Sequence, residues 1–146
     1  MLPATLYDLL NTSKITNLIA EYSYTAILKV PAIYNLWAKQ DSEFPYIVYR
    51  LESIEGNHWD KNTRYAYIDV WDYQEGGSTV TVDSIAREIK NVLHMLKTSD
   101  SDWGAMQVRF DNDGYVQEDE DYIIHYASRY RIRAWDVNFT TNSNNV

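Results

Sequence analysis

Apolar and polar side chains alternate strictly over two stretches near the middle of the chain. In the first stretch, 46–53, one face carries Ile47, Tyr49 and Leu51. In the second, 65–73, Ala66, Ile68 and Val70 share one face, and the other face carries Tyr65, Tyr67, Asp69, Trp71 and Tyr73. A period of two is typical of a strand with one buried face. The two stretches are therefore predicted to form an antiparallel pair, joined by a polar loop over 55–64.

A spacing of three and four residues replaces this alternation after Gly76 and Gly77. Between Thr79 and Leu96 the apolar residues with that spacing are Val82, Ile85, Ala86, Ile89, Val92, Leu93 and Leu96. The pattern predicts a long helix whose apolar stripe covers a sheet. Two short helices are expected before the first strand, because Pro3 suits a first helical turn and Ser13 can cap a helix.

The last third of the chain is predicted to contain two more strands. Residues 103–110 are expected to be extended, and a strand is expected over 122–137. Between them, Asp111-Asn112-Asp113-Gly114 matches a tight turn, because Asn and Gly tolerate the positive φ that such turns require. The final residues, 138–146, are mostly polar and are expected to form a flexible tail.

These elements predict one α+β domain over 1–137. The expected architecture is a mostly antiparallel sheet of about four to five strands, with the long helix and the short N-terminal helices packed on one face. The chain has 146 residues, which is enough to enclose one hydrophobic core.

Charge and cysteine content narrow the classes of function. The 21 acidic and 13 basic residues give a formal net charge of −8. This charge argues against a protein whose main function is to bind the phosphates of nucleic acid. The absence of cysteine removes disulfides and thiolate chemistry and fits synthesis in a reducing cytoplasm. The sequence shows no signal-peptide pattern and no apolar run of spanning length, so no membrane partner is expected.

Searching for catalytic patterns gives no candidate site. There is no Gly-x-Ser-x-Gly motif, and His58, His94 and His125 lie far apart in the sequence. The carboxylates of Asp111–Gly114 lack the register of a calcium loop, and Glu118–Asp121 is expected to be a solvated acidic loop. We therefore expect no catalytic residue, no metal site and no cofactor. The alternative from a different class is a small ligand-binding domain or an enzyme with a carboxylate site at Asp69 or Asp72, which would require a concave pocket.

Two sets of side chains are candidate interface residues. Arg129, Arg131 and Arg133 recur at a spacing of two, so they should share one sheet face. They form either a solvent face whose charges pair with acids such as Asp69 or Glu52, or a surface that docks a partner. The rings of Tyr65, Tyr67 and Trp71 should lie on the face that the helix leaves open, where an aromatic patch marks an interface.

The order of these elements resembles the tail completion, or tail terminator, proteins of long-tailed bacteriophages and prophages. The resemblance spans roughly residues 2–137. It is carried by the short N-terminal helix pair, by Phe44-Pro45-Tyr46-Ile47-Val48-Tyr49, by Ile68-Asp69-Val70-Trp71 before the helix, and by the final strand Tyr130-Arg131-Ile132-Arg133-Ala134-Trp135.

The resemblance implies a structural protein that caps the head-proximal end of the tail tube and joins tail to head. The implied partners are further copies of the chain in a homo-hexameric ring, the major tail tube protein and a head-completion or connector protein. Such a protein would be made in the bacterial host cytoplasm and would lie in the virion at the head–tail interface. DNA would pass near it in the lumen without sequence-specific binding. The alternative within the same class is another neck component, such as a head-closure protein. The loop at 55–64, the turn at 111–114 and the acidic loop after it are candidate contact elements.

Overall fold

The computed structural model describes residues 1–52 and 63–134. Three helices and eight strands occur in these ranges. In chain order they are α1 (Pro3–Leu10), α2 (Ser13–Thr16), β1 (Glu21–Ser23), β2 (Lys29–Pro31), β3 (Ile33–Asn35), β4 (Tyr46–Leu51), β5 (Thr63–Tyr73), α3 (Val80–Leu93), β6 (Lys97–Asp100), β7 (Gly104–Val116) and β8 (Ile123–Ala134). The predicted tail over 138–146, the end of the last predicted strand and most of the loop at 55–64 lie outside the described residues.

Six strands form one sheet in the order β3-β4-β5-β8-β7-β6. All neighbouring pairs are antiparallel except β3 and β4, which run parallel. The α+β class and the mostly antiparallel sheet agree with the prediction, and the antiparallel pairing of β4 with β5 is confirmed. The strand count of four to five was too low, because the short strands β3 and β6 extend the sheet at its two edges.

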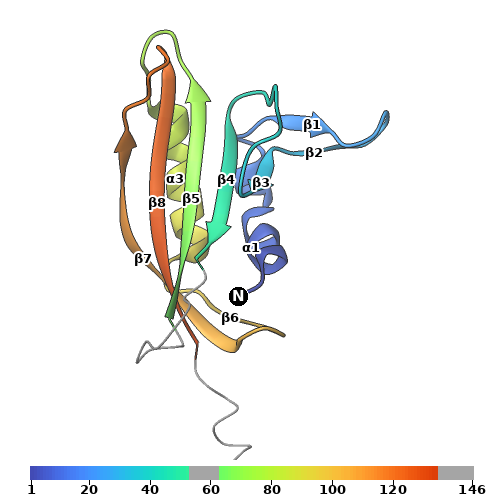
Figure 1. Ribbon diagram of the computed structural model, residues 1–146, viewed down its shortest axis with the longest axis vertical. Coiled ribbons are helices and arrows are strands. Elements are labelled where there is room, and N and C mark those ends of the chain that lie inside the picture. Colours follow the sequence, from blue (N-terminus) through green and yellow to red (C-terminus); the bar gives the residue numbers. More distant parts are fainter. Residues whose placement is uncertain (53–62, 135–146) are drawn as a thin grey trace, which may run out of the picture.

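The hydrophobic core lies between the sheet and the helices on one face. Figure 1 shows α3 behind β5 and β8. Helix α3 turns a stripe at spacings of three and four toward the sheet: Val82, Ile85, Ile89 and Leu93, all at most 1% exposed. The sheet contributes Ala66, Ile68 and Val70 on β5 to the core, and these are also at most 1% exposed. Each fully buried side chain of this size contributes about 1.5–3 kcal/mol relative to exposure, so this contact holds the two layers together.

Two local predictions near the helix and the last strands were wrong. Helix α3 ends at Leu93, three residues before the expected end, and the polar stretch after it forms the edge strand β6. Residues 111–114 do not form a turn, because β7 continues through them to Val116. Pairing with β8 outweighs the turn propensity there, and a bulge between Phe110 and Asn112 absorbs the extra residue.

The strands β1 and β2 form a separate hairpin beside the β3 edge. Figure 1 shows this hairpin projecting away from the rest of the molecule. Its tip is apolar: Tyr24 is 70% exposed, Ile27 is 96% exposed and Leu28 is 49% exposed. Large apolar side chains gathered on a projecting turn are typical of a contact with another protein.

Candidate interaction face

The sheet face turned away from the helices carries all six candidate interface residues. On β5, Tyr65 lies opposite Arg131 and Tyr67 lies opposite Arg129 of β8, while Trp71 lies opposite His125. Arg133 follows at the end of β8, opposite Thr63. The structure therefore brings the aromatic residues of β5 and the arginines of β8 into two adjacent rows on one face.

The aromatic rings on this face are half-buried because cations and a histidine cover them. The guanidinium of Arg50 lies 4.0 Å from the centre of the Tyr67 ring, and that of Arg129 lies 4.7 Å from the centre of the Tyr65 ring. The Tyr67 hydroxyl donates to Glu52 at 3.1 Å. Each ring thus sits in a cation–π contact, which favours a fixed position for both partners.

Arg129 differs from the other two arginines because it has an acidic partner. Its Nε lies 2.5 Å from Asp111 Oδ2, and Asp111 stands at the bulge of β7. The hydrogen bond to Asp111, with a second one to Tyr67, raises the pKa of Arg129 above its ordinary value. Of the two alternatives considered for the arginines, Arg129 therefore fits a charge that pairs with an acid of the same chain. The partner is neither Asp69 nor Glu52, the acids considered from the sequence.

His125 closes the opposite end of the same face. Its ring stacks on Trp71 at 3.7 Å between centroids with planes 11° apart. Nδ1 lies 2.6 Å from Glu118 Oε1, and Nε2 lies 3.3 Å from Asp69 Oδ2, an ion-pair distance without good hydrogen-bond alignment. Burial lowers the pKa of His125, but the two carboxylates raise it more, so the net shift is upward.

This histidine ties the loop between β7 and β8 to the sheet. Glu118 belongs to that loop, and the Gln74 backbone N–H donates to the Tyr122 carbonyl at 2.9 Å at the loop's other end. Between these two anchors the loop presents Asp119, Glu120 and Asp121, all exposed. These three residues form no ion pair with any other described residue. The end of the face near His125 is therefore acidic, and a hollow beside it is lined by Phe44, Tyr46, Trp71 and the loop.

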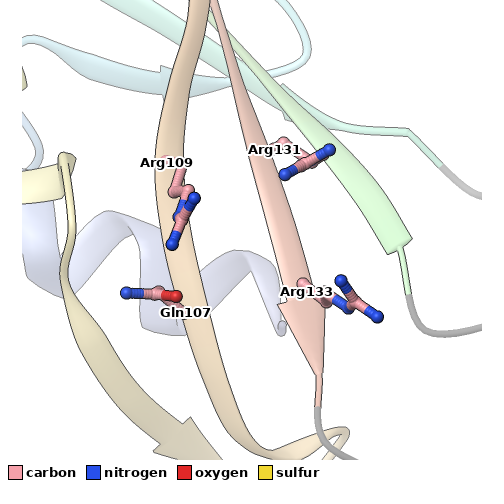
Figure 2. Close-up of a pocket in the computed structure, with 4 residues that line it drawn as sticks. All are labelled: Gln107, Arg109, Arg131 and Arg133. Carbon is pink, nitrogen blue, oxygen red and sulfur yellow. The ribbon is translucent and has the colours of Figure 1, made fainter.

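The other end of the face is basic. Arg109 and Gln107 of β7 lie directly opposite Arg131 and Arg133 of β8. Figure 2 shows the four side chains projecting from the same face of the two strands. They line a hollow of about 140 Å³. Within the described residues, none of the three arginines forms an ion pair. We call Gln107, Arg109, Arg131 and Arg133 the arginine cluster.

The arginine cluster costs stability in the isolated chain. Arg109 and Arg131 are a directly opposed cross-strand pair, and like charges in that position are destabilising. Lys97 adds a further positive charge, because it pairs with Gln107 from the edge strand β6. Like charges that destabilise the monomer, with no acidic partner among the described residues, are typical of a functional surface.

The carboxylates considered for an enzyme have local structural partners. Asp72 is 3% exposed and accepts hydrogen bonds from the Tyr73 backbone N–H at 2.8 Å and from Gln74 Nε2 at 2.9 Å. Asp69 faces His125, as described above. No group of three or more His, Asp or Glu residues suited to a metal ion occurs in 1–52 and 63–134. Across the same ranges, the structure contains no helix with the length and apolar character needed to span a membrane.

The chain is similar to known proteins in its fold and not in its sequence. No protein-family model and no curated protein sequence matches the chain. Among solved structures, it is similar to a chain described as "Virion of native gene transfer agent (GTA) particle". The TM-score is 0.64, with 12% sequence identity over 88% of this chain and 90% of that chain. The two chains share a fold. At this identity, the comparison extends to the fold alone.

Three features of the face were not found from the sequence. Arg109 and Gln107 join the arginine cluster only through the register of β7 against β8. Both alternate with the buried Met106 and Val108, so the sequence pattern could have placed them on the face opposite the core. The anchoring of the acidic loop by His125 had no signal, because Asp69 and Trp71 on β5 lie far from Glu118 and His125 in the sequence.

Proposed function

We propose that this protein is a structural component of a phage-type virion that caps the head-proximal end of the tail tube and joins the tail to the head. It acts as a ring of identical copies through protein–protein contacts and performs no catalysis. The observation that carries the proposal is the helix-free sheet face, which is basic at one end, acidic at the other and lined by ordered aromatic rings between them.

Such a face suits repeated contacts between identical subunits. Its two ends differ in charge, so a contact between them joins different patches of two copies. A contact of this heterologous kind generates a ring when its rotation closes. Aromatic and arginine side chains are the residues most enriched in the energetically important parts of interfaces.

Two further observations support assembly in a virion. The chain shares its fold with a chain from a solved structure of the virion of a native gene transfer agent particle. The β1–β2 hairpin also offers an exposed apolar tip, which a neighbouring virion protein could cover. The major tail tube protein and a head-completion or connector protein are the proposed partners, besides further copies of the chain. The proposed location is the head–tail interface.

Electron microscopy of the protein mixed with tail tubes tests the proposal. Negatively stained tubes should carry a ring at one end only, and phage that lack the gene should produce tails of abnormal length. A protein that leaves both tube ends bare, together with tails of normal length in the knockout, would refute capping. A protein that binds isolated heads but never tubes would instead identify it as a head-closure component.

A further inference from the structure

The arginine cluster differs from Arg64 and Arg129, each of which has an acidic partner. Arg64 lies 3.3 Å from Asp102 and Arg129 lies 2.5 Å from Asp111. Arg109, Arg131 and Arg133 instead face one another and a neutral glutamine. No acid among the described residues supplies their counter-charge, so the cluster suits an anionic group from another molecule.

The chemistry of the hollow defines what it can hold. Guanidinium groups are permanently charged and carry only N–H donors, in a fork that matches a carboxylate or phosphate with two parallel hydrogen bonds. The carboxamide of Gln107 can add one more donor at the same place. The site therefore fits a group with several anionic oxygens, and clustered carboxylates on an exposed loop meet that description.

The same chain supplies such a loop. Asp119, Glu120 and Asp121 are exposed and have no cationic partner among the described residues. Glu118, the preceding residue, is held by His125 at 2.6 Å. The anchor leaves the remaining carboxylates facing outward from a defined position, which reduces the entropy lost when they bind.

We call the arginine cluster the basic pole of the face and the loop Glu118–Asp121 its acidic pole. The two poles cannot meet within one subunit. They lie on the same sheet face near opposite ends of β8, where His125 and Arg133 are eight residues apart. At a rise of about 3.3 Å per residue, that separation is about 26 Å. This distance is far beyond the screening length of about 8 Å at physiological ionic strength. A neighbouring copy displaced along the strand direction can bring its acidic pole to the basic pole.

We propose that the arginine cluster of one copy binds the acidic loop, Glu118–Asp121, of the next copy. The inference rests on the proposed ring and identifies the contact that closes it. Nucleic acid is the less favoured occupant, because the net charge of −8 opposes binding to phosphate and the matching carboxylates lie on the chain itself.

Exchanging the charges of the two poles tests this contact. Arg131→Glu with Arg133→Glu makes both poles acidic, whereas Asp119→Lys with Glu120→Lys makes both poles basic. Each double variant alone should lose self-association by at least about tenfold, measured by light scattering after gel filtration and by crosslinking, with and without tail tubes. An equimolar mixture of the two variants should recover it, because every contact then joins opposite charges. Recovery in the mixture would show that misfolding was not the reason why each variant failed to associate alone.

A matched control separates this contact from the effect of total charge. Lys14→Glu with Arg87→Glu changes the net charge by the same amount at exposed helical positions, and should associate like the unsubstituted protein. The proposal is overturned if either pole variant associates normally, if the mixture fails to recover, or if the unsubstituted chain stays monomeric both alone and on tubes. It is also overturned if Arg131→Glu with Arg133→Glu loses binding to duplex DNA while still self-associating.

The outcomes for the contact and for tube capping are distinguishable. If the mixed variants assemble but never cap tubes, the contact stands and the proposed capping function fails. If each pole variant alone still forms rings on tube ends, capping stands and this contact fails.

Discussion

Replacing Arg131 with glutamate is expected to stabilise the isolated subunit while removing its ability to assemble. Arg131 is exposed and lies directly opposite Arg109 on β7. In the substituted chain this repulsive pair becomes an attractive one. Directly opposed cross-strand pairs contribute roughly 0.2–1 kcal/mol in either direction, so the sum of both effects is about 0.4–2 kcal/mol. Exposure to water and salt places the expected gain near the lower limit, at about 0.5 kcal/mol.

The assay is urea denaturation at a protein concentration where the chain is monomeric. The midpoint for Arg131→Glu should rise with an unchanged dependence on denaturant, because the surface exposed on unfolding stays the same. Arg133→Glu is the matched control, since it adds the same charge opposite the neutral Gln107 and Thr63. The difference between the two variants isolates the Arg109 pair. It should shrink as salt is added, because exposed charges are screened.

One result would refute the reasoning. If Arg131→Glu destabilises the monomer by more than about 1 kcal/mol relative to Arg133→Glu, Arg131 makes a stabilising contact within the subunit. The arginine cluster would then be part of the structural framework of the sheet. Its unpaired charges would no longer argue for an external partner.

Further predictions concern the core, His125 and the hairpin tip. Ile89→Ala should lower the free energy of unfolding by about 2–5 kcal/mol in chemical denaturation, because the side chain is only 1% exposed. The raised pKa of His125 predicts a stabilising contribution that is complete below pH 6.5 and is lost as pH rises through its folded value. The advantage of the unsubstituted chain over His125→Gln should therefore shrink as the pH rises above about 6.5. Ile27→Asp should change stability by less than about 0.5 kcal/mol yet reduce tube capping in the microscopy assay, since Ile27 is 96% exposed.

The parts of the fold that follow from sequence are those with one buried face. Along β5 the side chains of Ala66, Ile68 and Val70 are buried while Tyr65 and Tyr67 on the other face are half-buried. A slip of one residue would expose the whole apolar set, so the pattern specifies the face of each residue. The same reasoning applies to the stripe of α3.

The parts that could not be predicted depend on neighbours distant in the sequence. The strand β6 (Lys97–Asp100) is polar throughout and lies at an edge, so no apolar alternation marks it. Asp111 and Asp113 have the composition of a turn, but their partners on β8 keep β7 extended. Asp111 binds Arg129, and Asp113 accepts a hydrogen bond from the Tyr126 hydroxyl. Local propensity is a weak signal when such tertiary contacts compete with it.

The candidate site shows the same division. The spacing of Arg129, Arg131 and Arg133 was sufficient to place them on one face, and the structure agrees. The spacing could not show that Arg129 pairs with an acid, whereas Arg131 and Arg133 form no ion pair with any residue that the structure describes. That difference arises from the bulge, which brings Asp111 to Arg129 and sets Arg109 against Arg131.

The bulge therefore links the sequence to the proposed function. The extra residue in β7 supplies one acid to the middle of the face, and the end of the face carries arginines without an acidic partner among the described residues. His125 has the complementary effect at the other end, where it holds Glu118, and the next three carboxylates have no ion pair within the described part of the chain. Both features segregate charge that a monomer would be more stable pairing. In the proposed ring these opposite charges meet between subunits, and a contact of that kind repeats from copy to copy until the ring closes.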